Sequence, residues 1–208
     1  MTRDQIQNVH DDIAYMRAMA HEGRNAPLLS GPVMVVAGIV FSLASLVHWT
    51  IVAGLVNVSS WAQLWVWVTA AVIFTIGLVV VLRRQAHRPG AGSAGNRASN
   101  AAWSGVGYGI FASWVALMAA GMTTGDWALM RVMPIIVVVA YGSAWFVAGA
   151  MARLRWMKGV ALLSYAGAAV LGAFIDSPTV LLVYAALLVL VALLPGLALM
   201  RQEPAEVV

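Results

Sequence analysis

The chain has no cysteine among its 208 residues, which excludes a disulfide framework, a thiol nucleophile and a thiolate metal site. It is also poor in charge: 10% of its residues are Asp, Glu, Lys or Arg, whereas about a quarter of an ordinary soluble domain is charged. Lysine occurs once, as Lys158, and the other cations are arginine. Together with a hydrophobic content of 62%, these shortages exclude an ordinary soluble domain and indicate an integral membrane protein.

No Asp, Glu, Lys or Arg occupies the middle of any apolar segment. A proton-coupled transporter needs titratable groups at mid-depth, and a voltage sensor needs repeated arginines, so neither class is predicted. His48 is the single histidine within an apolar segment, which argues against bis-histidine haem ligation. His21 and Glu22 lack the second histidine that a zinc helix needs, and no Gly-rich phosphate loop precedes a helix. The sequence therefore predicts no catalytic residue, metal or cofactor.

Six apolar stretches of roughly 20 residues are each long enough to cross a bilayer as a helix. They are Val33 to Leu55, Trp61 to Leu82, Ala101 to Met122, Val132 to Ala152, Gly159 to Ile175 and Thr179 to Met200. We predict an all-α integral membrane protein whose six transmembrane helices form three hairpins, preceded by one cytoplasmic amphipathic helix. Leucines surround the last stretch, so we expect it to face lipid, or another protomer, over much of its circumference.

The cations sort to one side of this topology, as the positive-inside rule requires. With a cytoplasmic N-terminus, eleven of the twelve lie inside and Arg131 alone lies outside. The eleven are Arg3, Arg17, Arg24, Arg83, Arg84, Arg88, Arg97, Arg153, Arg155, Lys158 and Arg201. Because they are spread over short loops beside helix ends, their partner is anionic lipid and not nucleic acid. The abundance of Arg, Ala and Val suggests a bacterial inner membrane, with both termini cytoplasmic.

The predicted organisation has five parts. Residues 1–30 form a cytoplasmic amphipathic helix and linker, and they lack the apolar region of a signal peptide, so we expect the first spanning helix to direct insertion. Residues 31–84 hold transmembrane helices 1 and 2, and residues 85–100, rich in Gly, Ser and Arg, form a flexible cytoplasmic loop. Residues 101–201 hold helices 3 to 6, and residues 202–208 form a cytoplasmic tail.

The N-terminal segment carries a narrow apolar seam. Ile6, Val9, Ile13 and Met16 follow the 3,4 spacing of a helix that packs on another helix. One interpretation is an amphipathic helix that rests on the membrane surface or on the loops of the bundle. The other is a docking helix for a second copy of the chain or a soluble cytoplasmic partner.

Small residues recur every four positions on three of the predicted helices. The rows are Gly105, Gly109 and Ser113; Ala140, Ala144, Ala148 and Ala152; and Ser164, Ala168 and Gly172. Such rows let backbones approach closely, which is the main interpretation, and lining a pore is the alternative.

Two polar clusters are candidate sites. Tyr108, Ser143, Trp145, Ser164 and Tyr165 lie at a similar depth and predict either an aromatic pocket or rings that fill the bundle. At the outer face, the candidates are His48, Asp126, Arg131 and Asp176. Arg131 breaks the charge rule and is predicted to pair with Asp126 or Asp176, unless the group binds a small solute.

Two functional classes follow. The first is a non-enzymatic scaffold or regulator that presents the N-terminal helix to a partner or a second protomer. The second is a channel or facilitator for a small neutral or weakly acidic solute. The absence of intramembrane charge and the definite seam favour the first.

Overall fold

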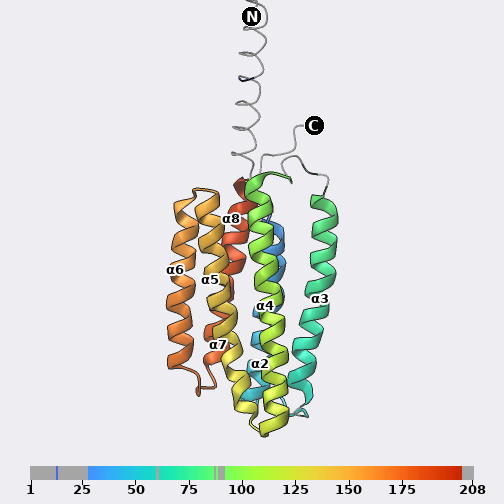
Figure 1. The fold of residues 1–208 in the computed structure, drawn as a ribbon. Helices are drawn as coiled ribbons and strands as arrows, with labels where there is room; N and C mark the ends of the chain where they lie inside the picture. Colours follow the sequence, from blue (N-terminus) through green and yellow to red (C-terminus); the bar gives the residue numbers. More distant parts are fainter. Residues whose placement is uncertain (1–12, 14–27, 60, 87, 89–91, 203–208) are drawn as a thin grey trace, which may run out of the picture.

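The computed structural model describes residue 13 and residues 28–59, 61–86, 88 and 92–202, and these residues are all-helical, with no strand. The helices are α2 (Gly31–Val52), α3 (Trp61–Gln85), α4 (Ala94–Thr124), the 3-10 helix η1 (Trp127–Val132), α5 (Met133–Met151), α6 (Arg155–Ala173), α7 (Val180–Leu188), the π-helical turn η2 (Val189–Leu193) and α8 (Leu194–Gln202). They run alongside one another as a bundle (Figure 1). Six spans, with η1 joined to α5 and with α7, η2 and α8 joined together, are long and apolar enough to cross a membrane. The prediction of a multi-pass, all-α membrane protein is confirmed.

Charge separates the two ends of the bundle. One end carries the last turn of α3, the start of α4, the turn between α5 and α6 and the end of α8 (Figure 1). We call it the basic end, because it holds Arg83, Arg84, Arg97, Arg153, Arg155, Lys158 and Arg201. The acidic residues of the described part of the chain, Asp126 and Asp176, lie at the opposite end together with Arg131.

The centre of the bundle is filled by side chains from α2, α5, α6 and the α7–η2–α8 stack. α2 packs against α3 on one side and against this stack on the other, and α5 packs between α4 and α6. Val138, Trp145, Met157, Leu171 and Val191 expose none of their surface. α3 and α4 lie at the periphery, where 6% of each apolar window is buried, and they have few contacts with each other.

The leucine-rich last span is the most buried of the six, with half of its apolar window inside the protein, so it faces lipid over less of its circumference than expected. Glycines on its neighbour explain the difference. A Cβ atom on Gly38 of α2 would lie 2.6 Å from the backbone nitrogen of Leu193. Gly31 and Gly196 approach so closely that a Cβ on either would lie 2.9 Å from the carbonyl oxygen of the other. Because α2 supplies the small residues, the bulky last span lies at the centre.

α4 begins at Ala94 and not near Ala101, so residues 94–100 are helical where a flexible loop was expected. The cause is Ser93, whose Oγ accepts a hydrogen bond from the backbone nitrogen of Asn96 at 3.2 Å. A serine N-cap of this kind satisfies one of the free amides at a helix start. The serine that seemed typical of a linker is therefore a helix cap.

Candidate functional site

Trp145 is at the centre of the bundle and is bound to the backbone of the last span. Its Nε1 donates a 2.7 Å hydrogen bond to the carbonyl of Val191 in η2. That carbonyl lies four residues before Pro195, which has no N–H to donate to it. The π-helical turn accommodates the proline, and the Leu194 N–H donates to Val189 five residues earlier. An α5 side chain therefore supplies the donor that Pro195 cannot supply.

An aromatic cluster surrounds Trp145. The ring of Trp103 on α4 meets both Tyr141 and Trp145 edge-on, with ring centres 5.3 Å apart in each pair. Trp156 on α6 lies 6.1 Å from Trp145. The indole nitrogens of Trp103 and Trp156 are buried and have no hydrogen-bond partner among the described residues. These geometries are typical of aromatic packing, and the packed rings stabilise the contacts of α5 with α4 and α6.

The five residues of the predicted aromatic pocket do not line one cavity. Ser143 Oγ and Tyr165 Oη lie 3.3 Å apart on the outside of α5 and α6, where the Tyr165 ring covers Gly142. Ser164 is buried and donates to the carbonyl of Val160 one turn earlier, at 2.9 Å. Tyr108 is 77% exposed on α4, and Trp145 is fully buried on another face of α5. The structure brings together only Ser143 and Tyr165.

The small residues of α4 line a shallow groove instead of a tight contact. The groove has a volume of about 370 Å³. Its lining residues are Ala102, Gly105, Val106, Gly109, Ala140, Ser143, Ala144 and Val147. A Cβ atom on Gly105 or Gly109 would meet nothing within 4 Å. The row on α4 therefore leaves space on the surface of α4 and α5.

At the end opposite the basic end, the predicted outer cluster forms one ion pair. Arg131 Nη1 lies 2.8 Å from Asp176 Oδ1, and this ion pair joins η1 to the turn after α6. Asp126 instead caps η1 by accepting a hydrogen bond from the Ala128 nitrogen at 2.9 Å. His48 lies between α2 and α3, where its Nδ1 accepts a 3.0 Å hydrogen bond from the Trp67 indole. The Arg131–Asp176 pair was predicted, but His48 does not join it.

The docking seam falls mostly outside the described residues. Ile6, Val9 and Met16 are not among them. Ile13 is, and it is helical and 38% exposed. The seam therefore remains a prediction from the sequence.

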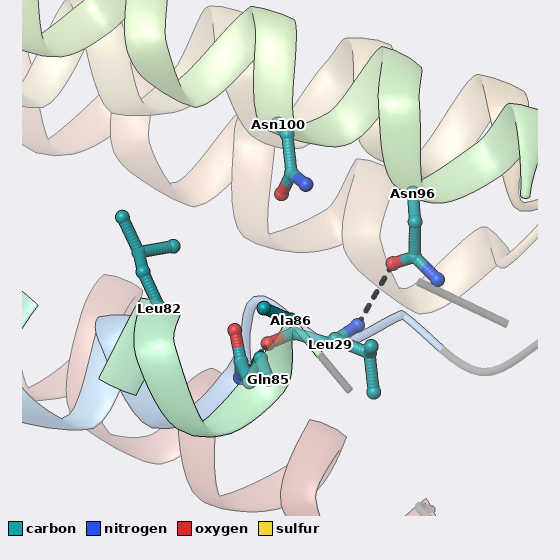
Figure 2. A pocket seen from close by; sticks show the side chains of 6 residues that line it. All are labelled: Leu29, Leu82, Gln85, Ala86, Asn96 and Asn100. Carbon is teal, nitrogen blue, oxygen red and sulfur yellow. Dashed lines mark hydrogen bonds between the residues drawn. The ribbon is translucent and has the colours of Figure 1, made fainter. Parts of the chain in front are cut away.

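A polar pocket at the basic end was not predicted. It is built around the backbone N–H and C=O groups of Leu29, just before α2. The Leu29 nitrogen donates a 2.9 Å hydrogen bond to Asn96 Oδ1 of α4, and the Leu29 carbonyl accepts one from Gln85 Nε2 of α3. Figure 2 shows these two amides on either side of the chain that leads into α2. Two amide side chains thus hold three elements together at this point.

The pocket beside this contact has a volume of about 100 Å³. It is lined by Leu29, Leu82, Gln85, Ala86, Asn96 and Asn100 (Figure 2). The signal in the sequence was a pair of short polar stretches next to apolar spans. Gln85 lies just after the second apolar span, and Asn96 and Asn100 lie just before the third. Their composition resembles a linker, which concealed their role in tertiary structure.

Neither a metal-binding cluster among the described residues nor a similar known protein points to a function for these sites. The described residues contain no group of three or more His, Asp or Glu side chains that could hold a metal ion. Comparisons with protein-family models, curated proteins and solved structures find no match. Function is therefore inferred from the geometry and chemistry of the chain itself.

Proposed function

We propose that the protein is a non-enzymatic membrane scaffold or regulator that presents an N-terminal docking helix to a soluble partner or to a second protomer. The observation that supports this proposal is the filled centre of the bundle. Trp145, Met157 and Val191 have no exposed surface there, and the Trp145 indole is hydrogen-bonded to the backbone. Close packing of this kind favours a rigid support over a substrate cavity.

The proposal includes an orientation. The six spans form three hairpins in a bacterial inner membrane, and the basic end faces the cytoplasm. The positive-inside rule supports this orientation, because the basic end carries the arginines and Lys158. The N-terminal segment, which precedes α2 in the sequence, would then be on the cytoplasmic side, where a soluble partner can reach it.

Docking through Ile6, Val9, Ile13 and Met16 is tested by the double variant Ile6→Asp/Ile13→Asp, which places two carboxylates in the seam. A matched control is Asn8→Asp/Tyr15→Asp. It adds two carboxylates with the same spacing, and at about 100° per residue they fall about 120–140° around the helix from the centre of the seam. We expect the seam variant to insert and stay stable in detergent but to lose the self-association or the cross-links to a partner that the wild type and the control retain. Retention of every association by the seam variant would contradict the proposal.

The α4–α5 groove favours a second candidate, a channel or facilitator for a small neutral or weakly acidic solute. Ser143 and small residues line this groove, so a narrow solute could follow it. Proteoliposomes test this alternative by measuring the uptake of glycerol and of acetic acid. Two results together would favour the facilitator. The flux should exceed that of protein-free liposomes, and the excess should fall when Gly109 is replaced by Leu. Flux equal to that of protein-free liposomes favours the scaffold.

A further inference from the structure

The pocket at the basic end combines hydrogen-bonding amides with apolar walls at a place where arginines gather. We propose that it binds an anionic phospholipid, with the phosphate at the amides and an acyl chain along α3 and α4. This inference does not depend on the scaffold proposal, because it concerns a different part of the molecule.

The amides supply the polar half of the site. Asn96 is 2% exposed and is held in place by its hydrogen bond to Leu29, so it forms a fixed wall. Asn100 lies one turn further along α4, and in Figure 2 its amide extends into the space opposite Leu82 and Gln85. It is exposed and is not part of the Leu29 contact. Carboxamide N–H groups donate to phosphate and ester oxygens, both of which a glycerophospholipid presents together.

Charge around the pocket selects an anion. Arg83 and Arg84 directly precede Gln85 in the last turn of α3, and Arg97 directly follows Asn96 in the first turn of α4. All three arginines are exposed. The start of α4 adds the positive end of a helix dipole. The acidic residues that the structure describes lie at the far end of the bundle. Basic pockets between spanning helices near a membrane surface are typical sites for acidic lipid headgroups.

The apolar half of the site indicates a lipid and not a free phosphate ion. Leu29, Leu82 and Ala86 form the rest of the wall, and a phosphate ion has no apolar surface to place against them. Below the pocket, α3 and α4 have few contacts with each other. Val79 and Leu82 expose 43% and 48% of their surfaces there. An acyl chain that runs from the pocket along α3 toward the middle of the membrane would cover Val79 and Leu82.

Lipid binding to the full-length protein tests the proposal. Native mass spectrometry in detergent measures the binding of phosphatidylglycerol, with phosphatidylcholine as the zwitterionic comparison and inorganic phosphate as the free-ion comparison. Three variants are needed. Asn100→Leu changes the pocket without changing the charge. Arg83→Gln/Arg84→Gln removes two charges beside the pocket. Arg153→Gln/Arg155→Gln removes two charges elsewhere at the basic end, at the turn between α5 and α6.

We expect phosphatidylglycerol to bind more tightly than phosphatidylcholine. Asn100→Leu should weaken that binding by about fivefold, and the Arg83/Arg84 variant by about fivefold for each arginine lost. The Arg153/Arg155 variant should stay within about twofold of the wild type, since the turn between α5 and α6 lies across the bundle from α3 (Figure 1). Equal losses in the two arginine variants, with Asn100→Leu unchanged, would show a diffuse surface attraction and overturn the site. Displacement of the lipid by equimolar inorganic phosphate would also overturn it, because the apolar half would then contribute nothing.

Discussion

The contact between α2 and the last span provides a sharp test of the packing, because it depends on a missing methyl group. In the variant Gly38→Ala, the added Cβ would lie 2.6 Å from Leu193 N, 2.7 Å from its Cβ and 2.8 Å from its Cα. Two of these atoms belong to the backbone of η2 and cannot rotate away. The two helices must therefore separate by several tenths of an ångström to accept the methyl group.

The magnitude follows from two opposing effects. Overpacking a well-packed core costs about 1–3 kcal/mol. Replacing glycine by alanine inside a helix returns about 0.5–1 kcal/mol. The control Gly109→Ala is the same chemical change within α4, where the new Cβ would meet nothing within 4 Å. The difference in unfolding free energy between the two variants therefore isolates the steric effect, and we expect Gly38→Ala to be less stable than Gly109→Ala by about 1–3 kcal/mol.

Unfolding in mixed micelles, followed by tryptophan fluorescence, measures both variants against the wild type. We expect the midpoint to fall for Gly38→Ala and to stay the same or rise for Gly109→Ala. Equal stability of the two variants would refute the close approach of α2 to η2. The central position of the last span would then lose its explanation.

Two further predictions concern single contacts. The Arg131–Asp176 pair is exposed, so a double-mutant cycle with Arg131→Leu and Asp176→Asn should give a coupling of about 0–1 kcal/mol in thermal unfolding, and the same cycle with Asp126→Asn should be additive; coupling to Asp126 but not to Asp176 would show that the observed pair is wrong. Trp145→Phe removes the donor to the η2 carbonyl and about one ring of volume, so it should lower the unfolding free energy by about 1–3 kcal/mol, whereas Trp114→Phe should cost less because Trp114 lies outside the central cluster, and equal losses would contradict that distinction.

The number and length of the spans could be predicted from the sequence, because bilayer thickness sets the length of each apolar segment and the segments can then be counted. Each crossing helix needs a long apolar segment, and the loops on one side attract cations. The ion pair of Arg131 could also be predicted from the topology. Arg131 is the one cation on the predicted outer side, and a cation there is expected to pair with a nearby carboxylate. Only Asp126 and Asp176 were near enough along the predicted topology, and the structure selects Asp176.

The rotation of each helix about its axis could not be predicted. Counting residues from the end of a span gives depth, so Tyr108, Trp145 and Tyr165 were placed in one layer. Direction depends on which neighbours a helix meets, and that information is tertiary. Tyr108 points away from the protein, whereas Trp145 lies in the centre.

The row of small residues on α4 misled in the same way. Gly105 and Gly109 are spaced for close packing but line an open groove. The close backbone contacts between α2 and the last span use Gly31 and Gly38, which are seven residues apart on α2, together with Gly196 after a proline. A row shows that close approach is possible, and only the partner helix decides whether it occurs.

The cytoplasmic position of the basic end is the central claim, because a soluble cytoplasmic partner can reach the N-terminal segment only in that orientation. Fusions to alkaline phosphatase, which is active only outside the cytoplasm, measure it most directly. We predict no phosphatase activity from fusions after Gly90 and after Val208, and high activity from a fusion after Ser177, in the turn that follows α6. Activity at Gly90 or Val208, with none at Ser177, would contradict the orientation and with it the proposed docking of a cytoplasmic partner.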